Sequence, residues 1–330
     1  MPKVLSAAPP ASPWSAKRAT EGYGQSAEPS WRKIDWLSLL RQTEIDGRKV
    51  NYVELGDGEG PPIVFVHGLG GQWQNWLENL PFFAQKRRVV ALDLPGHGLS
   101  EMPREKITIP GYGATVNEFA DRLELGKIDL VGNSMGGFVA AEVARESPER
   151  VNRLVLVSAA GITSADLQRS PGPAVLRAGG ALATYAAARF RQIAARPITR
   201  HMALALVARH PSLLAPDLVY EGLMKGTGKP GFADALRATL DYDFRDRLDD
   251  IRSPTLIVWG RDDAVIPAHD ADEYERLIPN SRKVVLDDTG HIPMVERPVA
   301  FNDCVGEFLE GEAVGQPTPG SGSEEEPAAA

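Results

Sequence analysis

A serine flanked by glycines is the residue of this chain best suited to act as a nucleophile. Residues 132–136 read Gly-Asn-Ser-Met-Gly, with Ser134 at the centre, an apolar run at 128–131 before them and a helical pattern after them. A serine on a sharp strand-to-helix turn presents its hydroxyl at the edge of a sheet, and glycines on either side let neighbouring elements come close. The pentapeptide alone is weak evidence, but its strand and helix context predicts a nucleophile rather than a helix N-cap serine.

A serine hydroxyl needs a general base at neutral pH, and the chain has six histidines. Position favours His291, which follows the last apolar run at 283–286 in a loop that would reach the same sheet edge as Ser134. The remaining histidines stand beside glycines in earlier loops, in an insertion or at a helix start, and we expect structural roles for them: His67, His97, His201, His210 and His269. Their spacing to carboxylates fits no zinc site such as His-Glu-x-x-His, so we expect no metal.

The imidazole of the base needs a carboxylate behind it to fix its tautomer. Two adjacent aspartates follow the apolar run at 255–259, and we expect Asp263 rather than Asp262 to face His291. The other usual place for this acid, after the run at 154–157, has no carboxylate. The sequence therefore predicts one acid, and it lies between the nucleophile and the base in chain order.

Attack on a carbonyl would develop negative charge on oxygen, which needs preorganised N–H donors. Met135 follows Ser134 at the expected start of a helix and is predicted to supply one donor. Residues 67–71 read His-Gly-Leu-Gly-Gly after the apolar run at 63–66, and their glycines would let the backbone approach a substrate. Leu69 is therefore the predicted second donor of an oxyanion hole.

Short apolar runs must position these residues. Residues 43–46 and 49–55 flank Asp-Gly, a dipeptide suited to a tight hairpin turn, so we expect the sheet to open with an antiparallel pair. Six further runs alternate with helical stretches, as is typical of a parallel sheet covered on both faces. These runs span 63–66, 88–92, 128–131, 154–157, 255–259 and 283–286.

Composition divides the chain into a core, an insertion and two tails. Residues 1–30 and 312–330 are rich in Pro, Gly, Ser and Ala and poor in apolar groups, so we expect a flexible N-terminal tail and a disordered C-terminal tail. Residues 163–250 have apolar residues at helical spacing and no strand-like run, which predicts a helical cap over the strand ends. The core would then comprise residues 31–162 and 251–311.

Charge and cysteine content exclude several classes of protein. The net charge is −8 and no Lys/Arg cluster forms, so we expect no nucleic-acid partner. Cys304 is the only cysteine, which rules out an intramolecular disulfide. No apolar run fits a signal peptide or a bilayer span, and these observations together predict a soluble cytoplasmic protein.

Residues 31–40 have the amphipathic character of an interfacial helix, although packing onto the domain is the favoured interpretation. The oligomeric state stays open.

Five motifs in order give the chain a resemblance to the α/β-hydrolase superfamily over residues 41–310. They are His-Gly-Leu-Gly at 67–70, Asp-Leu-Pro-Gly-His-Gly-Leu-Ser at 93–100, Gly-Asn-Ser-Met-Gly-Gly at 132–137, Gly-Arg-Asp-Asp at 260–263 and Gly-His at 290–291. The resemblance implies an α/β fold, with a mostly parallel eight-stranded sheet flanked by helices and a helical cap. It also implies no cofactor, a structural role for Asp93, and hydrolysis through an acyl-enzyme on Ser134. Dehalogenases and epoxide hydrolases of the family use an aspartate nucleophile, and the serine excludes them.

The leading hypothesis is a carboxylesterase or lipase type of hydrolase that acts on a small-molecule acyl ester. The motif at 132–137 is also similar to that of hydrolases that cleave carbon-carbon bonds in meta-cleavage products of aromatic degradation. Those enzymes often place tryptophan after the histidine, where this chain has Ile292, and this difference favours an esterase. Acyltransferases, cofactor-free peroxidases and a ligand-binding receptor remain alternatives.

Overall fold

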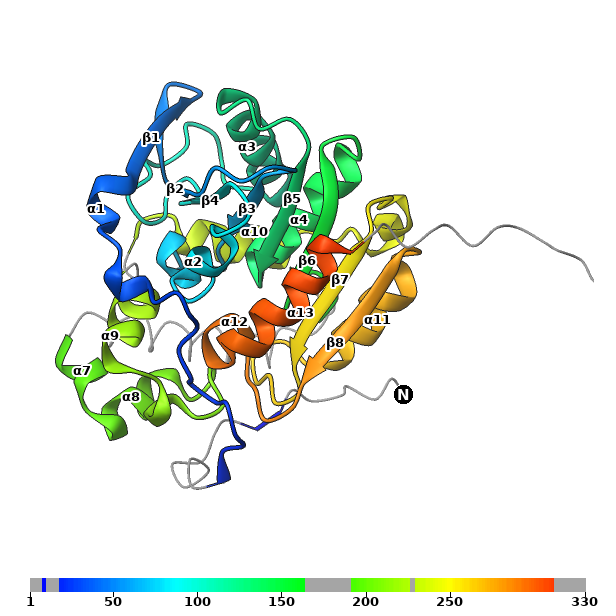
Figure 1. The fold of residues 1–330 in the computed structure, drawn as a ribbon. Coiled ribbons are helices and arrows are strands. Elements are labelled where there is room, and N and C mark those ends of the chain that lie inside the picture. The colour runs from blue at the N-terminus through cyan, green and yellow to red at the C-terminus, as the bar shows by residue number, and fades with distance from the viewer. Residues whose placement is uncertain (1–7, 10–17, 164–190, 226–228, 312–330) are drawn as a thin grey trace, which may run out of the picture.

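An eight-stranded sheet forms the centre of the computed structural model, which describes residues 8–9, 18–163, 191–225 and 229–311 (Figure 1). The strand order is β1-β2-β4-β3-β5-β6-β7-β8; β2 is antiparallel to β1 and β4, and every other neighbouring pair is parallel. The strands are β1 (Leu40–Ile45), β2 (Arg48–Leu55), β3 (Ile63–Val66), β4 (Val89–Leu92), β5 (Ile128–Asn133), β6 (Val151–Val157), β7 (Thr255–Gly260) and β8 (Ser281–Leu286). The predicted mostly parallel eight-stranded sheet is confirmed.

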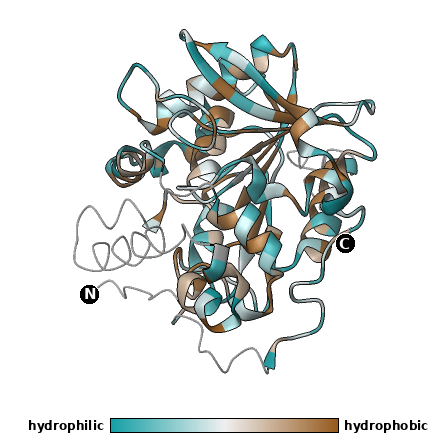
Figure 2. Ribbon diagram, turned by 90° about the vertical axis from the view of Figure 1, so that its left-hand side faces the viewer, coloured by the Kyte–Doolittle hydropathy of each residue, from teal (hydrophilic) through white to brown (hydrophobic). Residues whose placement is uncertain are grey.

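Apolar residues, mostly β-branched or aliphatic, fill β3 and β4 and make up most of β7, while β5 also contains the buried Asp129. Every residue of β3, β4, β5 and β7 is buried, as expected for parallel strands covered on both faces. The hairpin between β1 and β2 turns at Asp46 and Gly47, both with positive φ, which is the geometry that an Asp-Gly pair favours. Figure 2 shows hydrophobic residues along the interior strands and hydrophilic residues on outer loops and helix faces.

Helices cover both faces of the sheet because successive strand residues point to opposite sides. Val64 and Val66 of β3 belong to one buried apolar cluster with residues of α3 (Ile109–Arg122), α4 (Met135–Glu146) and α11 (His269–Leu277). Ile63 and Phe65 belong to a second cluster, on the other face, with residues of α2 (Leu80–Phe83), α12 (Pro293–Glu296) and α13 (Pro298–Glu310). The two faces together make an α/β sandwich of three layers.

The insertion between β6 and β7 is helical in its described parts, as predicted. It contains α7 (Arg191–Ala195), α8 (Pro197–Leu204), η4 (Pro211–Leu213), α9 (Pro216–Leu218), the π-helix η5 (Val219–Met224), α10 (Phe232–Asp241) and η6 (Arg245–Asp250). Much of the helical pattern on which the cap prediction depended falls at 176–190, outside the described residues. The end of the insertion differs from the predicted boundary at residue 250, because Phe244 and Leu248 are fully buried in the core and the Phe244 ring lies 4.5 Å from that of Phe138.

The prediction of a flexible tail over residues 1–30 is wrong for its described C-terminal part. The main-chain N–H of Thr20 bonds to Asp288, the hydroxyl of Tyr23 to Glu296, and the N–H of Ala27 to the buried Glu78. In Figure 1 this dark blue segment runs between the insertion helices and α12. Hydrogen bonds to carboxylates far away in the sequence hold this segment on the domain, and such bonds leave no apolar pattern in the sequence. The tail predicted at 312–330 lies outside the described residues.

The aromatic stretch after this segment packs onto the domain, which was the favoured interpretation. It forms η2 (Trp31–Lys33) and α1 (Trp36–Leu39). Trp31 is buried and its indole N–H donates to Glu78, while the Trp36 ring lies 5.0 Å from that of Trp73. Within the described ranges, none of the helices has the length and apolar character that crossing a bilayer requires.

Candidate active site

Ser134 stands in a strained turn between β5 and α4. Its backbone has φ 55° and ψ −119°, a combination that residues other than glycine rarely adopt. A β-carbon on Gly132 would lie 2.2 Å from the carbonyl oxygen of Gly136, and one on Gly136 would lie 2.3 Å from that of Val66. Both glycines are therefore required by the close approach of α4 to the strands, which is the steric reason inferred from the sequence.

Asp263 and His291 come from the loops after β7 and β8, and the structure brings them together. The Nδ1 of His291 lies 2.8 Å from Oδ2 of Asp263, whose side chain is fully buried. The other carboxylate oxygen accepts main-chain N–H bonds from Val265 and Ile266 at 2.8 and 2.9 Å. With its carboxylate fixed in this way, Asp263 can accept a hydrogen bond from Nδ1–H of His291, and in that tautomer Nε2 has the free lone pair.

The glycine-rich loop after β3 lies directly against the serine. A β-carbon on Gly68 would be 3.1 Å from Cβ of Ser134, so only a glycine allows this contact without a shift. His67 joins this loop to the loop after β4. Its Nδ1 lies 2.7 Å from the carbonyl oxygen of Gly68, and its Nε2 accepts the main-chain N–H of Leu94 at 3.0 Å. Burial lowers the pKa of His67 to about 3, which keeps the ring neutral and able to accept that bond.

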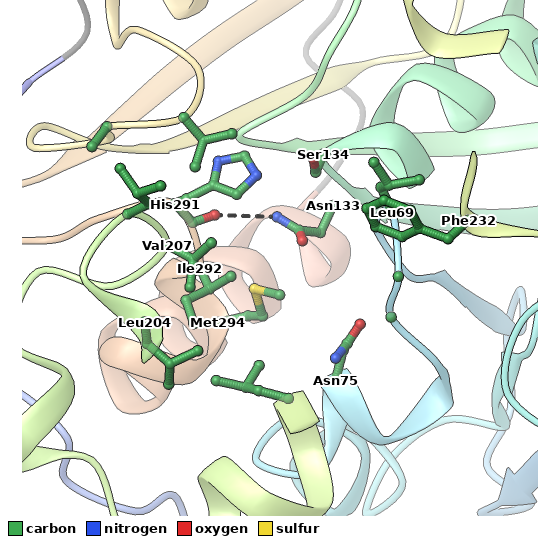
Figure 3. Close-up of a pocket in the computed structure, with 17 residues that line it drawn as sticks. Leu69, Asn75, Asn133, Ser134, Leu204, Val207, Phe232, His291, Ile292 and Met294 are labelled. Atoms are coloured by element: carbon green, nitrogen blue, oxygen red, sulfur yellow. Dashed lines mark hydrogen bonds between the residues drawn. The ribbon is translucent and has the colours of Figure 1, made fainter. Parts of the chain in front are cut away.

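A cavity of about 210 Å³ opens between this edge of the sheet and the insertion (Figure 3). Ser134 and His291 both line it, as do Leu69 and the main chain of Gly68. The rest of the described lining is almost entirely apolar: Leu204, Leu206, Val207, Leu223, Phe232, Ala264, Val265, Ile292 and Met294. Asn75 and Asn133 are the other polar side chains among the described lining residues, none of which is Asp, Glu, Lys or Arg.

Comparison with known proteins identifies the architecture that carries this pocket. The model of the family described as "alpha/beta hydrolase fold" matches residues 61–298. The chain belongs to the α/β-hydrolase family. The resemblance that the five sequence motifs indicated is therefore confirmed.

Several known proteins and solved structures are similar to this chain over most of its length. The chain is 36% identical over 278 residues to the dihydrolipoyllysine-residue acetyltransferase component of the acetoin cleaving system of Pseudomonas putida, covering 82% of this chain and 69% of that protein. It is 31% identical to the 2-hydroxy-6-oxo-2,4-heptadienoate hydrolase of Pseudomonas putida, covering 77% and 91%. The crystal structure of a membrane phospholipase A is similar with a TM-score of 0.63 and 25% identity, covering 82% and 85%.

Asp93 holds two loops of the hydrolase together, as the resemblance implied. Its carboxylate accepts the main-chain N–H of Trp73 and of Leu99 and the amide of Asn51, at 2.8 to 2.9 Å. Burial raises its pKa to about 6, while these donors act in the opposite direction. Asp93 is absent from the described lining of the cavity, so its contribution is to the loops that shape the site.

Asn75 and Phe232 line the pocket and connect distant segments, and neither was identified from the sequence. Asn75 donates from Nδ2 to the carbonyl oxygen of Gly222 at 2.5 Å and thereby joins the loop after β3 to the insertion. Phe232 opens α10 and packs against Gly70, where a β-carbon would lie 3.1 Å from its ring. Neither belongs to a recognisable motif, because each acts through a contact between segments far apart in the chain.

Proposed function

We propose that this hydrolase cleaves small-molecule carboxylic esters through an acyl-enzyme formed on Ser134. The observation that supports it is the arrangement around one apolar pocket. Ser134 lines that pocket from a strained turn, and His291, its Nδ1 fixed by a buried aspartate, lines the same pocket. A serine, a neutral imidazole and a buried carboxylate are the groups that acyl transfer requires.

In the proposed reaction Ser134 attacks the ester carbonyl while Nε2 of His291 takes the proton from its hydroxyl. Asp263 stabilises the imidazolium that forms, since its Oδ2 already lies at hydrogen-bonding distance from Nδ1. The N–H groups of Leu69 and Met135 are the proposed donors to the oxyanion. The N–H of Met135 has no acceptor within its own helix because this residue opens α4. His291 then gives its proton to the leaving alcohol, and water activated by the same nitrogen releases the acid.

The pocket favours an uncharged acyl group. Its described lining has no cation to pair with a substrate carboxylate, and burying an unpaired charge is costly. Among the arginines of the insertion, Arg196 is exposed and absent from the described lining; the side chain of Arg191 and all of Arg177 are outside what the structure describes. This lining is the reason to place an ester ahead of the carbon-carbon hydrolase, since the compound in the printed name of the Pseudomonas putida hydrolase, a heptadienoate, is a carboxylate.

The test is to compare wild type and Ser134→Ala for release of p-nitrophenol from esters of increasing acyl length. We expect the variant to lose at least about 10⁴-fold in kcat/KM, because loss of a triad serine removes nearly all turnover. Circular dichroism would show that the variant is folded. Turnover that persists in folded Ser134→Ala contradicts the proposal, and a wild type that cleaves only a meta-cleavage dienoate would favour the carbon-carbon hydrolase.

A further inference from the structure

A carboxylate outside the proposed catalytic set holds the loop that carries His291. Glu296 ends α12 and is fully buried. Both of its oxygens lie 3.0 Å from the main-chain nitrogen of Gly290, and Oε1 lies 3.3 Å from that of Ile292. These two N–H donors flank His291 on either side, so the carboxylate fixes the backbone immediately before and after the imidazole.

The N–H that lies between these two, that of His291 itself, is held by the insertion. The main-chain N–H of His291 donates to the carbonyl oxygen of Val207 at 3.0 Å, and Val207 also lines the pocket. Two residues later the N–H of Arg209 donates to Glu296 at 2.6 Å. The histidine loop and this part of the insertion are therefore tied to one carboxylate.

Tyr23 brings the N-terminal segment to the same carboxylate. Its hydroxyl donates to Oε2 of Glu296 at 2.8 Å and accepts the N–H of His210 at 2.8 Å. Its ring packs edge-on against that of His210, with 4.8 Å between centroids, and the N–H of Gly24 donates to the carbonyl oxygen of Glu296 at 2.7 Å. Burial, with Glu296 nearby, raises the pKa of Tyr23, so its hydroxyl stays protonated and available as a donor.

We propose that Tyr23 and Glu296 are positioning residues for His291, through which the N-terminal segment takes part in the activity of the hydrolase. This inference rests on the proposed function, in which His291 is the base. Loss of the Tyr23 hydroxyl removes one donor from Glu296 and one acceptor from the His210 N–H, and buried groups that lose partners shift to recover them. A displacement of a catalytic group by about 1 Å can lower a rate up to about 100-fold.

The test compares Tyr23→Phe with a matched control, Tyr242→Phe. The Tyr242 hydroxyl also donates to a buried glutamate, Oε1 of Glu142 at 2.9 Å, but Glu142 lies on α4 about 12 Å along the helix from Ser134. The measurements are kcat and KM for p-nitrophenyl esters, the thermal midpoint, and the rate at which a fluorophosphonate labels Ser134. The label reports how well base and nucleophile are aligned without a turnover cycle.

We expect Tyr23→Phe to lower kcat and the labelling rate about tenfold with KM within about twofold, and Tyr242→Phe to change neither rate. We also expect Glu296→Gln to lower both rates, and Tyr23→Phe to add little to it, because the tyrosine acts through that carboxylate. Equal rates in the two tyrosine variants, or a higher KM with kcat intact, would overturn the positioning role while leaving the proposed function standing. A wild type whose Ser134 does not react would overturn both.

Discussion

The two walls of the pocket differ in what they present to a substrate. The core wall, formed by the loops after β3, β5, β7 and β8, carries every described polar side chain of the lining, Ser134 and His291 among them. The cap wall, formed by Leu204, Leu206, Val207, Leu223 and Phe232 of the insertion, presents only apolar side chains. In the core wall Asn75 and Asn133 donate to main-chain carbonyls and His291 bonds to the Asp263 carboxylate, whereas the side chains of the cap wall act through shape. The side chains proposed for the chemistry and those that shape the pocket therefore come from separate elements, while the main chain of the cap wall also holds the histidine loop through Val207.

Asp263→Asn should have the largest effect, and it should affect all substrates alike. The two N–H groups of Val265 and Ile266 that bind Oδ1 would hold the amide oxygen in its place and turn the NH₂ toward His291. Nδ1 would then have to accept, the proton would move to Nε2, and the imidazole would no longer act as a base. We expect kcat to fall about 10³- to 10⁴-fold at every acyl length. A loss confined to long or short esters would show that the core wall also selects substrate.

Phe232→Ala should change substrate preference and leave the chemistry intact. Shortening this side chain of the cap wall enlarges the pocket beside Gly70, so longer acyl chains should gain about fourfold in kcat/KM for each additional methylene that is buried. The measurement is kcat/KM across the ester series, together with the fluorophosphonate labelling rate of Ser134, which should stay unchanged. Leu213→Ala, at a partly exposed residue of the insertion that is absent from the described lining, is the control. A uniform fall across the series would contradict the separation of the two walls.

His97→Phe should have the smallest effect at neutral pH and a larger one in acid. Burial lowers the pKa of His97 to about 4, below the 6.5 of an unfolded chain. As the pH falls, the imidazole is therefore protonated in the unfolded state before it is protonated in the folded state. This difference lowers the unfolding free energy of wild type as the pH falls from about 6.5 to 4. Phenylalanine cannot be protonated, so the unfolding free energy of the variant should rise relative to that of wild type across that range, by at most about 3 kcal/mol.

Urea unfolding from pH 4.5 to 7.5 would measure this gain. Tyr112→Phe is the control, because its hydroxyl lies 3.5 Å from Nδ1 of His97 but does not titrate in this range. Unfolding free energies that run parallel for wild type and His97→Phe would show that burial does not lower the pKa of His97.

The sequence predicts the core wall much better than the cap wall, for a physical reason. A buried parallel strand needs mostly apolar residues, and a sharp turn at a serine needs glycines, so both leave local patterns around Ser134. The placement of Asp263 and His291 follows from the strands that precede them, and the structure brings the two side chains together as expected. Their catalytic roles stay predictions until the variants are measured.

Contacts between distant segments left no such pattern. Tyr23 and Glu296 are 273 residues apart, and composition alone placed Tyr23 in a tail. Asn75 likewise reaches the carbonyl oxygen of Gly222, 147 residues away. A hydrogen bond of this kind depends on one side chain at each end, which gives it no periodicity to detect.

The position of the insertion in the sheet also bears on how such a hydrolase can change over time. β6 and β7 are adjacent and parallel, with Val157 paired to Val258, and the insertion leaves from one of them and returns to the other. The sheet thus fixes where both ends of the insertion lie, whatever lies between them, and lengthening a loop whose ends are fixed costs little additional entropy. Segments of different length and sequence can be exchanged at this point if the main-chain contacts of Val207 and Arg209 with the histidine loop and the buried ring of Phe244 are kept. The insertion is therefore the part of the enzyme best suited to grafting, by evolution or in the laboratory, when a new substrate is sought.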